Sequence, residues 1–214
     1  MFTRTTKGKA RTVRLASLQV RLGAKAGSRA VSAKVSGKRI DVLLLDLRKG
    51  EYAVDAKASS VRIGGTEITE LSDRALTLLR RERVGFVFQS FNLLPTLTAA
   101  ANIRLPLELA GRSPDPGWWD QVIGKLGLAD RLGHKPSELS GGQQQRVACA
   151  LALLSRPDVV FADEPTGNLD SRSGQEVLSL LRNSVRELGQ TVVMVTHDPV
   201  AAAYADRVVF LADG

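Results

Sequence analysis

The sequence contains a single cysteine, Cys149, so no disulfide can form within the chain. It has no run of 18 or more apolar residues, which argues against a membrane-spanning helix within these 214 residues. The basic N-terminus is not followed by an apolar segment long enough for a secretory signal, so we expect none. These absences favour a soluble globular protein, in agreement with the hydrophobic content of 43%. A lone cysteine also fits a reducing compartment.

Positive charge is concentrated at one end of the chain. Residues 1–60 hold 14 lysines and arginines against four acidic residues, whereas residues 61–214 hold 16 against 18. Residues 1–39 show no clean helical or strand periodicity and are rich in Lys, Arg, Ala, Ser and Gly, a composition that leans towards disorder. We therefore predict an atypical basic segment over residues 1–60, joined to a globular domain over residues 61–214.

The second part of the chain alternates buried strands with helices. This order predicts an α/β fold with a parallel core sheet covered by helices. Residues 98–139 contain helical patterns with no intervening strand, and predict a helical subdomain on that sheet. Expected strands cover residues 40–47, 84–88, 159–162, 191–196 and 207–211, with a hairpin over 61–68. Expected helices cover residues 72–83, 98–110, 118–126, 141–155, 173–188 and 200–205.

The string LSGGQ, residues 139–143, stands immediately before one of the expected helices. Its two glycines allow close backbone approach to a ligand, and a helix start presents free N–H groups, which together favour an anion. A glycine-rich loop with an ordinary helix cap is the alternative interpretation. The QQR that follows makes this alternative much less attractive.

Two carboxylates, Asp163 and Glu164, end the apolar run VVFA. At the carboxyl edge of a parallel sheet, one carboxylate can hold Mg²⁺ and the next can orient or deprotonate a water. Acidic residues that cap a following helix would give the same local pattern. The spacing from Gln143 to Asp163 argues against coincidence.

Three further polar residues occupy positions next to expected strands or loops. His197 follows the buried strand that comes after Glu164 in the chain, Asp170 ends the string GNLD, and Gln89 ends the strand VGFVF. A histidine in such a place is more often structural than catalytic. A glutamine at a strand end can reach a metal or a water, although a polar strand end is equally ordinary.

Taken in order, LSGGQQQR, VVFADEPTGNLD and VVMVTHD resemble the ATP-binding subunits of ABC transporters. The resemblance covers residues 61–214, the larger part of the chain. Residues 88–111 and 196–214 look most like the lipoprotein-release and macrolide-export branch. The resemblance implies a P-loop NTPase-like fold, the cofactors ATP and Mg²⁺, and ATP hydrolysis that powers export or membrane extraction.

The resemblance also implies a role for each matching residue. Glu164 would be the catalytic base and His197 the switch histidine near the γ-phosphate. Asp163 and Gln89 would contact Mg²⁺. The nucleotide-binding residues would be Gln89, Ser140, Gly141, Gly142, Gln143 and Asp170, with the signature acting on ATP held by the opposite subunit.

The same resemblance implies the partners and the location. A second ATPase subunit would complete a dimer, and residues 98–139 would dock on a transmembrane permease subunit. The chain would be peripheral, at the cytoplasmic face of the cell membrane, and we do not expect a nucleic-acid partner. A soluble ABC ATPase of DNA repair or translation is the main alternative within the family.

One motif of the family does not occur anywhere in the sequence. The pattern G-x-x-x-x-G-K-[ST] supplies the N–H groups, the lysine and the hydroxyl that hold ATP phosphates and Mg²⁺. The closest string is Ser36-Gly37-Lys38-Arg39, in which Arg39 replaces Ser or Thr and Ser32 replaces the first glycine. We also expect the chain to be truncated after Gly214.

Three origins for residues 1–60 remain open from the sequence. They can be a frameshifted or wrongly joined segment, which we favour. They can be the divergent start of a non-hydrolysing subunit that contributes LSGGQ to a partner's ATP site. They can also be a basic arm for nucleic acid or acidic lipid, although they lack interleaved aromatic residues.

Overall fold

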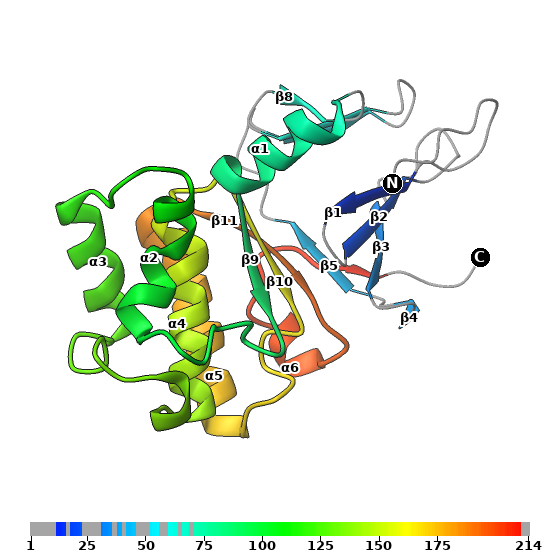
Figure 1. Ribbon diagram of the computed structural model, residues 1–214. Helices are drawn as coiled ribbons and strands as arrows, with labels where there is room; N and C mark the ends of the chain where they lie inside the picture. The colour runs from blue at the N-terminus through cyan, green and yellow to red at the C-terminus, as the bar shows by residue number, and fades with distance from the viewer. Residues whose placement is uncertain are drawn as a thin grey trace.

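The computed structural model describes residues 66–68 and 71–208 with their side chains, and strands β1–β7 and β12 by their backbone. Within these residues the chain forms three sheets and a group of helices packed on one side of the central sheet (Figure 1). No helix in this described part is both long and apolar enough to cross a membrane.

The central sheet has five strands in the order β12-β5-β11-β10-β9. Strands β9, β10 and β11 are mutually parallel, with Ala162 opposite both Val87 and Met194. Strand β5 lies between β11 and β12 and runs antiparallel to both. The bounds are Val84–Phe88 for β9, Val159–Asp163 for β10, Thr191–Val195 for β11, Val42–Leu45 for β5 and Val209–Phe210 for β12.

The sheet is therefore mixed, whereas the sequence predicted a parallel one. The strand predicted over residues 40–47 is present and does lie inside the sheet. Its direction could not be read from the sequence, because the run VLLL is apolar on every side and suits either orientation.

Each parallel strand is apolar because both of its faces are covered or stacked. Val87, Val160 and Ala162 are buried in the main hydrophobic core beneath the helices. On the opposite face, Phe86 stacks on Phe88 and on Phe161, with ring centroids 5.7 and 5.9 Å apart. Burial on one face and stacking of half-buried aromatic rings on the other explain why the β9 and β10 sequences do not alternate between apolar and polar residues.

Several helices begin at side-chain caps. Ser72, Thr98 and Ser140 each accept a bond from a backbone N–H in the first turn. Gly127 and Gly189 end α3 and α5 in the left-handed conformation, with φ of 61° and 67°. The helices are α1 Asp73–Arg83, α2 Ala99–Leu109, α3 Pro116–Leu126, α4 Gly141–Leu154, α5 Ser171–Leu188 and α6 Pro199–Ala202, with the 3₁₀ turn η1 Pro136–Glu138.

Helices α2 and α3 form a helical unit on the far side of α4 from the sheet (Figure 1). The backbone N–H of Ala99 donates to His134 O at 2.8 Å, which closes this unit on itself. The Trp118 indole Nε1 donates to Leu153 O at 3.2 Å and fixes α3 to the end of α4. Between residues 98 and 139 the structure contains no strand, as predicted.

Two antiparallel sheets complete the described backbone. The predicted hairpin over residues 61–68 is present as β7 and β8, with Ile63 opposite Thr66. A four-stranded sheet occupies part of residues 12–39, where the sequence indicated no regular periodicity. The strands are β1 Thr12–Leu15, β2 Leu18–Leu22, β3 Val31–Val35, β4 Lys38–Arg39, β6 Tyr52–Asp55, β7 Ser60–Ile63 and β8 Thr66–Glu67.

Candidate functional site

The carboxyl ends of β10 and β11 bring the two predicted catalytic residues together. Asp163 is the last residue of β10 and lies opposite Val195, the last residue of β11. Glu164 and His197 follow these two strands, and the parallel register places them at the same edge of the sheet. They are far apart in the sequence, with the whole of α5 between them, so it is the pairing of β10 with β11 that makes a shared site possible.

Glu164 is held by both its backbone and its carboxylate. Its φ of 45° lies in the left-handed region, which is costly for a residue with a side chain. Its N–H donates to Val195 O at 2.9 Å, and its own carbonyl accepts from the Gly167 N–H at 3.0 Å. These bonds turn the chain sharply at the strand end and direct the carboxylate towards β11.

The Glu164 carboxylate makes three contacts with the residues that follow β11. Its Oε1 accepts from the backbone N–H of His197 at 3.0 Å and lies 2.6 Å from the His197 ring Nδ1. Its Oε2 accepts from the Thr196 hydroxyl at 3.1 Å. A carboxylate offers about four acceptor positions, so one remains for a water molecule. The side chain is thus oriented as a general base requires.

His197 presents its ring to solvent while one of its nitrogens is committed to Glu164. The side chain is 83% exposed, and only Nδ1 contacts the carboxylate. The other nitrogen, Nε2, is therefore available to an incoming ligand. With the Nδ1 proton donated to Glu164, Nε2 can donate a second bond only when the ring is positively charged.

Asp163 has the properties expected of a carboxylate that binds a metal. Its Oδ1 is buried and has no hydrogen-bond partner among the described residues. Burial, and then the neighbouring negative charge of Glu164, raise the pKa of Asp163 from 3.8 to about 6. A buried, unbonded carboxylate oxygen is a suitable ligand for Mg²⁺. The described residues hold no cluster of three His, Cys, Asp or Glu, so the ion would keep water or phosphate ligands.

Gln89 lies against the loop that follows Glu164. Its Nε2 donates to Asn168 Oδ1 at 3.1 Å, and Asn168 Nδ2 donates back to Gln89 O at 3.1 Å. A Cβ on Gly167 would lie only 2.6 Å from Gln89 Nε2, so glycine is needed for this close approach. The predicted metal-contacting amide is therefore bonded to Asn168 here.

The predicted signature residues form the start of α4. Ser140 and Gln143 make a reciprocal capping box, in which Gln143 N donates to Ser140 Oγ and Ser140 N donates to Gln143 Oε1. A Cβ on Gly142 would lie 3.0 Å from the Ser173 side chain, and one on Gly141 would lie 3.3 Å from Leu169. The glycines thus let the starts of α4 and α5 lie side by side.

Asp170 caps α5 next to this signature. Its Oδ1 accepts from the backbone N–H groups of Ser173 and Arg172 at 3.0 and 3.1 Å. The Ser173 bonds, backbone first, lower the pKa of Asp170 and keep it ionised. Its present role is therefore a helix cap at the side of the site.

The predicted residues thus form two groups, joined by residues 164–170. Asp163, Glu164 and His197 form the group at the edge of the sheet. The second group contains the start of α4, residues 140–143, and Asp170. Gln89 is bonded to the connecting loop at Asn168.

Comparison with known families agrees with this arrangement. The family model described as "ABC transporter" matches residues 42–167, which is more than half of the chain. The chain belongs to the ABC transporter family. Its fold is the α/β, P-loop NTPase-type fold of ABC ATPase cassettes, with a helical subdomain.

Curated relatives of this ABC chain are much longer than it is. A "Probable export ATP-binding/permease protein" of Pseudomonas fluorescens is 42% identical over 94% of this chain and 30% of the relative, an alignment that includes most of residues 1–60. A "Macrolide export ATP-binding/permease protein MacB" of Rhodopseudomonas palustris is 49% identical over 73% of this chain and 24% of the relative. The chain therefore spans less than a third of these relatives.

Solved ABC cassettes share the fold over most of the chain. The dimeric bacterial ABC transporter cassette MJ0796 is 39% identical, covers 72% of this chain and 74% of its own, and has a TM-score of 0.58. A post-hydrolysis dimer of the same cassette, bound to ADP and Pi, is 30% identical and has a TM-score of 0.61 over 97% of this chain and 98% of its own.

Several residues of this ABC site were not recognised from the sequence. Thr196 and Asn168 bond directly to Glu164 and Gln89. Asn102, which is 1% exposed, bonds the backbone of Leu94, Leu97 and Thr98 and fixes the segment after Gln89. Gln145 is fully buried and bonds two main-chain carbonyls at the strand ends. A polar residue on an apolar helix face was the available signal for Asn102 and Gln145.

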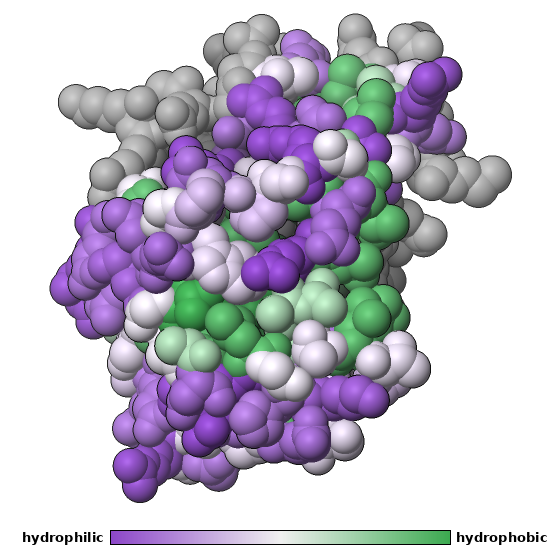
Figure 2. Space-filling view, turned by 60° about the vertical axis from the view of Figure 1, so that its left-hand side comes forward, coloured by the Kyte–Doolittle hydropathy of each residue, from purple (hydrophilic) through white to green (hydrophobic). Residues whose placement is uncertain are grey.

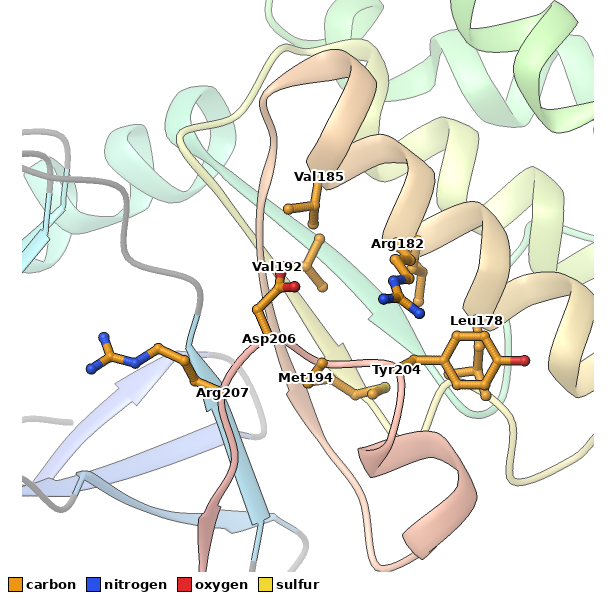
Figure 3. A pocket seen from close by; sticks show the side chains of 10 residues that line it. Leu178, Arg182, Val185, Val192, Met194, Tyr204, Asp206 and Arg207 are labelled. Carbon is orange, nitrogen blue, oxygen red and sulfur yellow. The ribbon is translucent and has the colours of Figure 1, made fainter.

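A separate groove lies between α5, β11 and the segment after α6 (Figure 3). Its floor is aliphatic and includes Leu178, Val192 and Met194, and the Arg207 side chain points away from the other labelled residues. It contains none of the predicted site residues. Apolar residues also gather across the middle of the face shown in Figure 2, between polar margins. Asp206 also lines the groove, but Asp163, Glu164 and His197 do not.

Proposed function

We propose that this chain is the ATP-binding and ATP-hydrolysing part of an ABC transporter that powers export or extraction from a membrane. The observation that carries the proposal is the Glu164 carboxylate, fixed by His197 and Thr196 beside the unbonded oxygen of Asp163. The relatives named above are export ATP-binding/permease proteins, which supports export as the direction of transport.

The proposed chemistry is attack of a water molecule on the γ-phosphate of ATP. Glu164 accepts the proton of the attacking water at the carboxylate position that its three protein contacts leave open. His197 contacts a γ-phosphate oxygen through Nε2, while its contact with Glu164 through Nδ1 fixes the orientation of the ring. The rigid support of Glu164 contributes by keeping the base oriented before the ligand arrives.

Mg²⁺ would be held by Asp163, and Gln89 would join it after leaving Asn168. When bound, the ion neutralises charge that develops on the phosphate oxygens. Its own charge would also favour the ionised form of Asp163 over the protonated form. Asp163 thus holds the ion, whereas Glu164 remains free to act on water.

The working unit would be a dimer beside a membrane subunit. The dimeric cassette named above supports this arrangement, since a signature at the start of α4 can face a nucleotide held by a second chain. Residues 98–139, with α2 and α3 on the outer side of α4, would contact a transmembrane permease subunit. The chain would then be peripheral, at the cytoplasmic face of the membrane.

The test uses a chain in which residues 1–60 are replaced by a family segment that carries G-x-x-x-x-G-K-[ST]. We expect this chain to bind Mg·ATP and release phosphate. Substituting Glu164→Gln should lower turnover by a factor of about 10² or more and leave nucleotide binding intact. The matched control is Glu187→Gln, since Glu187 pairs with Lys125 at the far end of α5. Full turnover in the Glu164→Gln variant would refute the assignment of the base.

A further inference from the structure

Gln145 interrupts an otherwise small and apolar face of α4. The residues at helical spacing on the same face are Gly142, Cys149 and Ala152, all buried. Gln145 itself has 0% exposure. A glutamine buried among apolar groups is unfavourable unless its amide makes specific bonds.

The Gln145 amide bonds the main chain beside two site residues. Its Nε2 donates to Pro165 O at 2.7 Å and to Phe88 O at 3.2 Å. Pro165 directly follows Glu164, and Phe88 directly precedes Gln89. One side chain of α4 therefore holds the ends of both β9 and β10.

The amide oxygen of Gln145 shows that the two donated bonds are not there to satisfy the Gln145 side chain. Its Oε1 is buried and has no hydrogen-bond partner among the described residues. A buried acceptor without a partner is a net cost to folding. An apolar residue would avoid that cost, so the two donated bonds must supply something that packing alone does not.

We propose that Gln145 is a positioning residue that ties Gln89 and Glu164 to the helix beginning at Ser140. Displacement of α4 by a ligand at its N-terminus is thereby passed to the base and to the metal-contacting glutamine. The catalytic meaning of this link rests on the proposed function, whereas the link itself does not.

A second connection makes the link continuous. Asn168 bonds both the side chain and the carbonyl of Gln89, so the loop after Glu164 is also joined to the end of β9 directly. Glu164 occupies a left-handed conformation that only its surroundings maintain. Release of Pro165 O would free this loop to relax and would move the Glu164 carboxylate.

The backbone N–H of His197 reports on that carboxylate, because it donates to Glu164 Oε1. The test compares amide hydrogen exchange in Gln145→Met with that in Gln190→Met. Gln190 is a matched control: it is 8% exposed, and its Nε2 donates to the carbonyls of Pro157, which precedes β10, and of Thr191, the first residue of β11. Both variants lose a buried amide, so both lower the global stability.

We expect Gln145→Met to accelerate exchange of the His197 and Gly167 N–H groups about tenfold more than that of the slowest core amides. In Gln190→Met, these two amides and the core amides should change by the same factor. Equal changes in both variants would mean that Gln145 only stabilises the fold, and would overturn the proposal.

A second measurement covers the case in which Gln145→Met fails to fold. In the unsubstituted chain, the Gln145 side-chain N–H protons and the His197 N–H should become exposed to exchange in the same opening event. Their exchange rates should therefore depend on denaturant concentration in the same way. Different dependences would also overturn the proposal. Failure of this proposal can be told apart from failure of the proposed function. The proposed function is tested by ATP turnover in the Glu164→Gln experiment, and its failure would not change the exchange rates measured here.

Discussion

At the scale of single residues, the site depends on the different hydrogen-bonding surroundings of two adjacent carboxylates. Glu164 has three hydrogen-bonding contacts, whereas Asp163 Oδ1 has none among the described residues. Two adjacent acids with opposite surroundings can divide their roles, one as an oriented base and one as a metal ligand. This difference is set by the protein before any ligand binds.

The first prediction concerns the pH dependence of stability at Asp163. Its pKa is about 6 in the folded chain against 3.8 ordinarily, so the folded state holds the proton more tightly. The contribution of Asp163 to the free energy of unfolding should therefore be largest below about pH 4 and fall as the pH rises to about 6. The shift corresponds to at most about 3 kcal/mol, and solvent screening at this partly exposed group reduces it to about 1 kcal/mol.

Urea unfolding of the natural chain and of Asp163→Asn at several pH values checks this prediction. The stability of the natural chain relative to Asp163→Asn should decrease between pH 4 and pH 6, and the difference should then be constant. Added Mg²⁺ should restore part of the loss. Parallel pH curves for the two proteins would contradict the assigned environment of Asp163.

The second prediction concerns Gly167. Substitution by alanine places a Cβ 2.6 Å from Gln89 Nε2, and the flexible glutamine must move. Because only the end of a side chain is displaced, we expect a loss of under about 1 kcal/mol in stability. The side-chain NH₂ signals of Gln89 and Asn168 should shift in NMR spectra. Gly133→Ala, where nothing lies within 4 Å of the new Cβ, is the control and should leave both signals in place.

At the scale of elements, the sequence predicted most helices and strands because their ends carry local signals. Ser72, Thr98 and Ser140 begin their helices as expected. The helix predicted from residue 118 begins instead at Pro116, since Asp115 caps it and proline suits a first helical position. The helix predicted over residues 200–205 is shorter, at Pro199–Ala202.

Other features could not be predicted because they arise between distant segments. The direction of β5 depends on the path of the chain and not on its own apolar residues. The bonds of Gln145 and Thr196 depend on the ends of strands being brought together. Sequence motifs named the residues that carry the proposed chemistry, but they did not reveal the residues that orient them.

The third prediction tests the contact between β9 and α4. A Cβ on Gly85 would lie 2.6 Å from the Ala152 carbonyl oxygen, which belongs to the backbone and cannot move away easily. Gly85→Ala should lower the free energy of unfolding by about 2 kcal/mol or more. Gly124→Ala, in α3 with nothing within 4 Å, should raise it by about 0.5–1 kcal/mol. Denaturant midpoints measure both, and equal effects would refute the close contact.

At the scale of the whole molecule, the residues proposed to activate water, Glu164 and His197, lie together at one edge of the sheet. The sequence contains no G-x-x-x-x-G-K-[ST] pattern for the phosphate-binding side. Phosphoryl transfer relies mainly on positioning and charge neutralisation, and a base without a held phosphate has nothing to act on.

The fourth prediction follows from the presence of the proposed base without the phosphate-binding motif. The purified chain of 214 residues should show neither a saturable heat of Mg·ATP binding at micromolar concentrations nor turnover above background. Mixed with an intact ABC subunit, it should raise turnover only if its own signature completes the partner's site, and Ser140→Ala should then remove the gain. Micromolar ATP binding by the unmodified chain would show that residues 1–60 supply a phosphate site of a different kind.

The anchoring of α3 on α4 gives this protein a built-in optical probe. The chain has two tryptophans, and they are adjacent in α3. The Trp118 ring packs under Arg156 at 4.8 Å and bonds the end of α4, whereas Arg104 covers Trp119 at 4.5 Å. Intrinsic tryptophan fluorescence therefore reports how the helical unit of α2 and α3 packs on α4. A change in emission on adding a ligand would indicate a movement of α4, without any attached dye.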